Sequence, residues 1–215
     1  APAERLRETF TPVIMREDID VLSVATRPDC LGERELLMLE RLSRKTTLWV
    51  ELGLQTIHPR TAEYIRRGYD LAVFDDAVRR LKAAGIKVIV HVILGLPGET
   101  PEMMYDTVRH VGECGADGIK LQLLHVLENT DLADEYRKGV FDCLTLPRYT
   151  DVLIRCIKAL PPDMVIHRMT GDGDKRTLIA PEWSKNKKVV LNYINKALAD
   201  GNVTQGEDFG KEDNS

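Results

Sequence analysis

The stretch Lys87-Val-Ile-Val-His-Val-Ile-Leu94, followed by Gly95-Leu-Pro-Gly-Glu-Thr100, decides the fold class. Eight residues dominated by branched apolar side chains have the length and composition of a buried β-strand. The glycine-containing turn leads into Thr100–Cys114, where a capping threonine, a proline in the first turn and a closing Gly115 predict an α-helix. The stretch therefore predicts a strand followed by a helix, which is the repeating unit of α/β proteins.

Three more apolar runs repeat this pattern. The predicted strands are Asp20–Ala25, Leu48–Leu54 and Gly118–Leu124, and the helical patterns after them are Glu33–Lys45, Leu71–Ala84 and Asn129–Gly139. Their spacing is that of βα units with parallel strands. Beyond them we predict a helix at Pro147–Leu160, a strand at Met164–Met169 and a helix at Pro181–Ala199. We expect one domain over residues 1–200 and a polar, mobile tail over 201–215.

Composition narrows the class of protein. The 215 residues are 43% hydrophobic and 30% charged, which is ordinary for a soluble globular domain. The formal net charge is −4 without a strongly basic stretch, so nucleic-acid binding by this part is not indicated. The apolar runs are strand-length and the first residues are charged, so neither a membrane span nor a signal peptide is expected. These features predict a cytoplasmic protein.

The four cysteines do not form a ligand motif. Cys30, Cys114, Cys143 and Cys156 are widely separated, and no CxxC pair is present. Iron–sulfur and zinc sites need closely grouped thiolates, and disulfides are rare in a cytosolic chain of this size. The sequence therefore predicts four reduced thiols and no metal site.

Alternation along the strands separates an apolar face from a polar one. Val50, Leu52 and Leu54 share one face of their strand. The opposite faces of the four strands carry polar groups, namely Arg27, Glu51, Gln55, His91, Lys120 and Gln122. Burying such groups unpaired costs a few kcal/mol each, about 2–7. They predict a solvated or ligand-filled cavity, and the alternative is an open sheet with one wet face.

Several motifs lie where predicted strands end, which is where α/β barrels place their sites. The turn at Gly95 leads to a helix N-terminus that favours anions, although a tight turn explains it equally well. Arg67 follows Gln55 closely enough to reach back and clamp a carboxylate, unless it is a solvated helix-end arginine. His91 lies on the polar face and is either a site residue or a satisfied core histidine.

The order and spacing of these motifs resemble the radical S-adenosylmethionine (SAM) superfamily, and in particular the YhcC-like family of uncharacterised radical SAM proteins. The stretches that carry the resemblance are Ala25-Thr-Arg-Pro-Asp29, Glu51-Leu-Gly-Leu-Gln-Thr56, Ile65-Arg-Arg-Gly68, His91-Val-Ile-Leu-Gly-Leu-Pro-Gly-Glu99, Gly118-Ile-Lys-Leu121, His167-Arg168 and Thr177-Leu-Ile-Ala-Pro181. Together they span roughly residues 1–183.

The resemblance implies an α/β fold, a partial (β/α)6 TIM-like barrel of which this chain holds strands three to six and a C-terminal extension. The family's first two strands, and the three-cysteine loop that binds its [4Fe–4S] cluster, would precede Ala1. The family is catalytic and acts as an oxidoreductase, because its reduced cluster cleaves SAM to a 5′-deoxyadenosyl radical. This chain alone is therefore expected to be inactive, and the intact protein to use both SAM and the cluster.

The resemblance also assigns site residues. Gln55 and Arg67 match contacts to the methionyl part of SAM, and His91 and Ile93 match an adenosine-facing pair. The other motif residues assigned to the cofactor pocket are Thr26, Glu51 and Gly95. The residues expected to face substrate or help close the barrel are Lys120, Gln122, His125, His167 and Arg168. Ala25 stands where relatives often carry a ribose-binding glutamate, and no catalytic residue is assigned.

Two other functions remain open from the sequence. The first is a cluster-free relative that binds a ligand or protein partner without radical chemistry. The second is an unrelated phosphate-binding barrel enzyme, based on the turn at Gly95. The substrate is not named by any motif. A truncated barrel would expose the edge of its first strand, so self-association is also expected.

Overall fold

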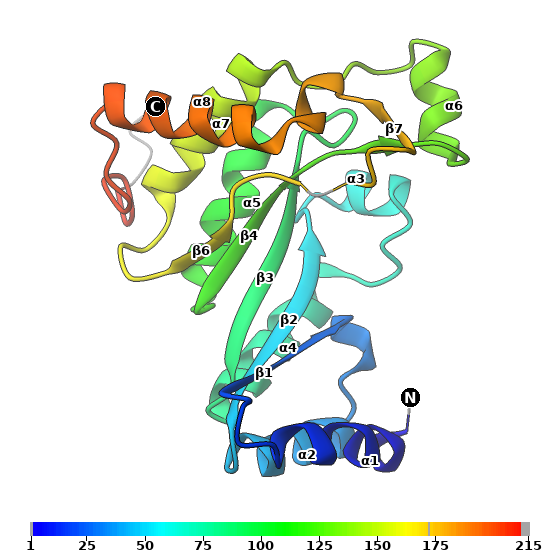
Figure 1. The fold of residues 1–215 in the computed structure, drawn as a ribbon, viewed down its shortest axis with the longest axis vertical. Helices are drawn as coiled ribbons and strands as arrows, with labels where there is room; N and C mark the ends of the chain where they lie inside the picture. The colour runs from blue at the N-terminus through cyan, green and yellow to red at the C-terminus, as the bar shows by residue number, and fades with distance from the viewer. Residues whose placement is uncertain (1, 172, 212–215) are drawn as a thin grey trace.

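The computed structural model describes residues 2–171 and 173–211. Its centre is a five-stranded parallel sheet in the order β1-β2-β3-β4-β6 (Figure 1). The strands are β1 (Val21–Thr26), β2 (Thr47–Gln55), β3 (Lys87–Leu94), β4 (Gly118–Leu123) and β6 (Val165–Arg168). The predicted strands are thus confirmed to within a few residues at each end, and the fold is the predicted α/β fold with a parallel sheet.

Helices follow the strands in the predicted rhythm. The helices are α1 (Ala3–Ile14), α2 (Glu33–Ser43), α3 (Pro59–Tyr64), α4 (Leu71–Ala83), α5 (Pro101–Glu113), α6 (Asp131–Arg137), α7 (Leu146–Ala159) and α8 (Lys187–Asp200). Short 3-10 helices lie at Pro28–Cys30 and Glu182–Lys185. Figure 1 shows α1 and α2 at the end of the molecule opposite α6 and α8.

The core forms between the apolar face of the sheet and the helices. Val50, Leu52 and Leu54 of β2 are fully buried, as is Val90 of β3. They belong to one cluster with Phe74 of α4 and further side chains from α5 and α7. Fully burying a side chain of this kind contributes about 1.5–3 kcal/mol, so this face holds the layers together.

Local signals in the sequence explain where the long helices begin. The hydroxyl oxygen of Thr100 accepts a hydrogen bond from the backbone N–H of Met103 at the start of α5. Thr145 caps α7 in the same way, and each helix has a proline in its first turn. A capped start satisfies backbone donors that have no partner inside the helix.

Several elements differ from the sequence-based expectation. The helices α1 and α3 were not predicted, nor was the antiparallel pair β5 (Val126–Leu127) and β7 (Leu178–Ala180). The last helix is split, because a 3-10 turn precedes α8. No helix in the described ranges is long and apolar enough to cross a membrane.

The segment after α8 folds back onto the end of α7. The side chain of Gln205 donates to the carbonyl oxygens of Pro161 and Met164, at 2.6 and 2.7 Å. Lys158 of α7 forms an ion pair with Glu207. The predicted mobile tail therefore has its first part, up to Lys211, packed against the domain, and residues 212–215 lie outside the described residues.

Candidate functional site

The end of β2 contains a bulge. Gly53 pairs with His91 and Gln55 with Val92, so one extra residue lies between them. Gln55 has a left-handed backbone with φ of 67°. A bulge re-aims the side chains beside it. At Gly53 an added Cβ would lie 2.8 Å from the amide nitrogen of Gln55, so only glycine leaves room for that amide.

Arg67 stabilises this bulge from behind. Its guanidinium donates to the carbonyl oxygens of Thr56 (2.5 Å), Leu54 (3.2 Å) and Tyr69 (2.8 and 3.0 Å). Arg67 is only 7% exposed, and burial lowers its pKa. The sequence left two roles open for Arg67, a carboxylate clamp or a solvated helix-end arginine. The guanidinium is not solvated, and most of its donors are already used, so it is not fully free to clamp a carboxylate. Most of its donors bind main-chain oxygens around the bulge, of which that of Leu54 also accepts from the backbone N–H of Thr56.

Tyr69 completes the support. Its hydroxyl donates to the carbonyl oxygen of Gly53, and burial raises its pKa. The guanidinium carbons of Arg67 and Arg27 lie 4.7 and 5.3 Å from the centre of the Tyr69 ring. Cation–π contacts of this kind hold both arginines beside the strand ends.

A cavity of about 570 Å³ opens at the carboxyl ends of β2, β3 and β4. This is the size of a small-molecule site. Its walls include six residues that the sequence analysis assigned to cofactor or substrate, namely Gln55, Arg67, Ile93, Gln122, His125 and Arg168. The predicted cavity on the polar side of the sheet is therefore present.

Below the cavity, the carboxylate of Glu51 joins polar groups from three other strands. It accepts hydrogen bonds from Ser23 of β1 (2.7 Å), His91 of β3 (2.6 Å) and Lys120 of β4 (2.5 Å). Burial opposes its ionisation, but the hydrogen bonds from Lys120, Ser23 and His91 outweigh burial and lower the pKa of Glu51 to about 2. We call Ser23, Glu51, His91, Lys120 and Gln122 the polar rung.

The polar rung fixes the tautomer of His91. Glu51 accepts a hydrogen bond from Nε2–H of His91, and the amide nitrogen of Gln122 donates to Nδ1 at 2.9 Å. Burial lowers the pKa of His91, which the hydrogen bond to Glu51 only partly offsets. A neutral imidazole protonated at Nε2 fits both partners. With both nitrogens engaged, His91 is placed to orient Gln122 at the cavity wall rather than to exchange protons with a ligand.

The two remaining histidines of interest lie elsewhere along the same side. His167 of β6 packs edge-on against Trp49 with ring centres 5.3 Å apart. His125 lies between Gly171 and Gly173, where an added Cβ would come within 2.5 Å of its ring. Those glycines let the segment after β6 cover one wall of the cavity.

Four of the predicted cofactor residues lie outside the cavity wall, namely Glu51 and His91 of the polar rung, and Thr26 and Gly95. Thr26 ends β1 and its hydroxyl contacts the carbonyl oxygen of Arg27. Gly95 is buried in a tight turn with φ of 87°, and its N–H points to the sulfur of Met104. Next to this turn the carboxylate of Glu99 accepts a hydrogen bond from Thr56, and burial raises its pKa. A carboxylate there disfavours the alternative of a phosphate site.

Part of the cavity wall was not assigned to the site from the sequence. Tyr69 and Arg66 line the cavity, and so does Arg27, which was noted only for its place on the polar face. Arg27 and Arg66 form exposed ion pairs with Asp29 and Asp131. The motif Ile65-Arg-Arg-Gly68 could have indicated that its neighbours face the site too.

The residues present fit a SAM-like ligand in one respect. The side-chain oxygen of Gln55 is buried and has no hydrogen-bond partner among the described residues. Buried polar atoms are nearly always satisfied, so an orphaned acceptor at a cavity suggests a ligand donor such as an ammonium group.

The described residues do not fit an iron–sulfur cluster. Within residues 2–171 and 173–211, no three His, Cys, Asp or Glu side chains gather around one point. The four cysteines are free and dispersed, as predicted. Burial raises the pKa of Cys114 and Cys143 to about 11 and that of Cys156 to about 12, so these thiols are held protonated.

A parallel sheet with helices on one side and a cavity at its carboxyl ends defines a partial α/β barrel. Residues 4–111 match the family model of the radical SAM superfamily, and residues 116–200 match that of the Radical_SAM C-terminal domain. The chain belongs to the radical SAM superfamily, as its motifs predicted.

The chain is also similar to individual proteins. The uncharacterised protein YtqA of Bacillus subtilis is 42% identical over 97% of this chain, and the match covers 65% of YtqA. YhcC of Escherichia coli is 33% identical over 98% of the chain and 68% of that protein. Among solved structures, Elp3 of Methanocaldococcus infernus shares the fold with a TM-score of 0.72 at 22% identity, over 86% of this chain and 43% of Elp3. The chain thus spans about two thirds of the length of YtqA and of YhcC.

Proposed function

We propose that this chain forms the SAM-binding part of a radical SAM enzyme whose cluster ligands lie outside the described residues. The observation that carries the proposal is the buried, unpartnered oxygen of Gln55 at a 570 Å³ cavity formed by strand ends. If the intact enzyme holds SAM and a [4Fe–4S] cluster, these cofactors would supply radical chemistry for hydrogen-atom abstraction, and the residues of this chain would bind and orient SAM.

The chain's own residues act by binding and orienting. Gln55 would accept a hydrogen bond from the amino group of SAM, and Ile93 would offer apolar surface from β3 in the same wall. Arg67 holds the bulge that places Gln55, and its one remaining N–H would be the donor for the ligand carboxylate. The polar rung fixes Gln122, while His125 and Arg168 of the opposite wall face the substrate. No acid–base pair is required, because hydrogen-atom abstraction needs none.

Calorimetric titration of the chain with SAM tests the binding site. Gln55→Ala is expected to weaken binding about tenfold or more, because a hydrogen bond to a charged donor contributes about 1.5–3 kcal/mol. Asn195→Ala removes an exposed amide from α8 and serves as the matched control, with unchanged affinity expected. Equal affinities in Gln55→Ala and the native chain would remove the basis for the site.

The cluster assignment has a separate test. Anaerobic reconstitution with iron and sulfide is expected to leave this chain without a stable cluster, because no ligand group is present among the described residues. Stoichiometric iron with cluster absorbance on this chain would contradict the assignment. A gene whose product carries three closely spaced cysteines upstream of Ala1 supports it, whereas a start codon at this point favours the alternative, a cluster-free relative that binds a ligand or a partner.

Self-association is proposed for this chain. Among the described strands, β1 pairs only with β2, so its other edge offers unpaired backbone groups. Sedimentation velocity of the chain is expected to show dimers or larger species at high concentration. A monomer at all concentrations would contradict this expectation.

A further inference from the structure

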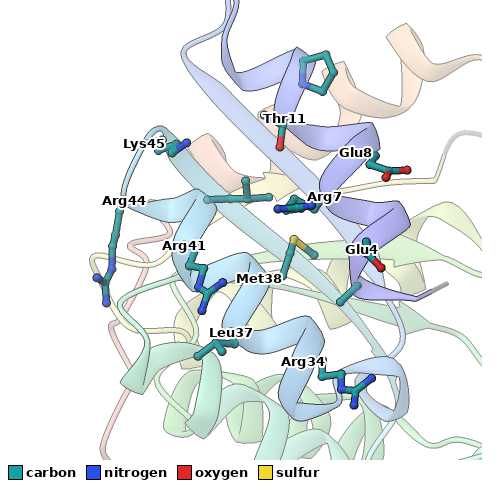
Figure 2. A pocket seen from close by; sticks show the side chains of 13 residues that line it. Glu4, Arg7, Glu8, Thr11, Arg34, Leu37, Met38, Arg41, Arg44 and Lys45 are labelled. Atoms are coloured by element: carbon teal, nitrogen blue, oxygen red, sulfur yellow. The ribbon is translucent and has the colours of Figure 1, made fainter.

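A second cavity, larger than the proposed SAM site, lies elsewhere in the described structure. It is a groove of about 1020 Å³ between α1 and α2, at the far end of the molecule (Figures 1 and 2). On α2, the lining residues Arg34, Leu37, Met38 and Arg41 recur every three to four positions, so they share one helical face. On α1, lining residues recur from Ala3 to Pro12, along nearly the whole helix.

The floor of this groove is apolar. Met38 and Leu42 are 7% and 4% exposed, whereas Leu37 at the rim is 51% exposed. In Figure 2 the side chains of Leu37 and Met38 come from α2, opposite the α1 residues of the other wall. A half-exposed leucine is ordinary on its own. Leu37, however, borders a large groove and lies next to buried apolar side chains, so it enlarges the apolar surface that a partner could contact.

The rim of the groove carries uncompensated positive charge. Among the described residues, Arg7, Arg34, Arg41 and Lys45 form no ion pair with a carboxylate. Arg44 is the exception on α2, since it pairs with Glu40 at 2.7 Å. All charged residues that α2 and the turn after it contribute to the lining are cations, and the acids of the lining, Glu4 and Glu8, belong to α1.

The position of Arg34 has no structural advantage. It lies in the first turn of α2, directly after Glu33. The N-terminus of a helix carries partial positive charge, so a cation there is unfavourable by a few tenths of a kcal/mol, about 0.3–1. By contrast, Arg41 in the last turn favours the helix. Arg34 therefore fits a contact made outside the chain better than a role in folding.

We infer that this groove binds an acidic amphipathic helix of a protein partner. Such a helix would place apolar residues at a spacing of three and four on Leu37, Met38 and Leu42, and carboxylates toward Arg34 and Arg41. The twelve residues of α1 span about 18 Å at 1.5 Å per residue, so three turns of a partner helix would fill the groove. A nucleic acid fits less well, because the groove offers no aromatic side chain for base stacking.

Two designed helical peptides of sixteen residues provide the probe. They share one leucine stripe, and the flanking positions are glutamate in the first and lysine in the second. Titration into the ¹⁵N-labelled chain is followed through backbone amide shifts, with a single-stranded RNA oligonucleotide as a competitor. The acidic peptide is expected to shift amides of α1 and α2 and to bind about tenfold or more tightly than the basic peptide, since charge complementarity decides the partner.

Variants separate charge from apolar contact. The double variant Arg34→Glu/Arg41→Glu is expected to reverse the preference between the peptides, and Leu37→Ala to weaken the acidic peptide several-fold without changing the preference. Arg5→Glu alters an exposed arginine of α1 outside the groove and is expected to have little effect. All these positions are exposed or at the rim, and the amide spectrum itself reports whether each variant is folded.

Three results would overturn the inference. They are equal affinity for the two peptides, shifts that lie away from α1 and α2, and displacement of the acidic peptide by the RNA at lower concentration than by unlabelled peptide. The last would assign the groove to nucleic acid. SAM binding at the other end of the molecule is measured independently, so failure here leaves the proposed cofactor site standing.

Discussion

The polar rung and the groove between α1 and α2 differ in whether their charged side chains are paired within the chain. Glu51 accepts hydrogen bonds from three strands, so the charges of Glu51 and Lys120 in the polar rung are paired within the chain. In the groove, Arg34 and Arg41 have no carboxylate partner among the described residues. Charges that are paired internally position other groups, whereas charges left unpaired on an apolar surface are available to a partner. Substitutions should therefore affect stability at one end and association at the other.

The largest loss of stability is expected at Arg67. Arg67→Ala removes the guanidinium from the carbonyl oxygens of Leu54, Thr56 and Tyr69. The oxygen of Leu54 keeps the backbone N–H of Thr56, but those of Thr56 and Tyr69 lose this donor, so we expect the free energy of unfolding to fall by about 3 kcal/mol. Arg67→Lys keeps the charge but cannot reach all three oxygens, and should lose most of the same amount. Urea denaturation measures both. Arg60→Ala, an exposed arginine of α3, should change stability by less than about 0.5 kcal/mol.

Glu51→Gln is expected to have the next largest effect. The amide accepts more weakly than the carboxylate and leaves the Lys120 ammonium without a counter-charge, so unfolding free energy should fall by about 2 kcal/mol. Glu40→Gln breaks the exposed pair with Arg44 and should cost less than about 0.5 kcal/mol. Similar losses in the two variants would show that the rung is no more than another surface pair.

The difference in unfolding free energy between the native chain and Glu51→Gln should depend on pH. The pKa of Glu51 is lowered from 4.5 to about 2 in the folded protein, so the unfolded chain takes up the proton first as pH falls. The carboxylate's contribution is complete above about pH 4.5 and is lost between there and pH 2. The gap between native and Glu51→Gln unfolding curves should therefore narrow as pH falls from 6 to 3. Parallel curves would place the carboxylate outside the network.

The smallest effect is expected in the groove and has the opposite sign. Arg34→Glu puts an acid in the first turn of α2, which should raise the free energy of unfolding by about 0.3–1 kcal/mol. Thermal unfolding at low salt measures it. A loss of more than about 1 kcal/mol would show that Arg34 stabilises the fold, and the groove would then resemble the polar rung.

The sequence was informative where side chains alternate. Branched residues at every second position of β2 and β3 predicted both strands and both faces, because the period of a strand is fixed by its backbone. The strand ends also located the cavity. Residue types alone did not show that Arg67 points into the protein. Its orientation depends on the bulge at the end of β2, where Gln55 has a positive φ. The groove was equally hidden, because α1 was not predicted.

The polar rung also constrains how the sheet can assemble. Ser23, Glu51, His91 and Lys120 lie on four successive strands and meet through one carboxylate. A slip of any strand by one residue would turn its member to the helix-packed face and leave a polar group in the apolar core. The polar rung therefore favours the native strand register. In a misregistered sheet its hydrogen bonds cannot form, so wrong strand pairing costs free energy even without a ligand.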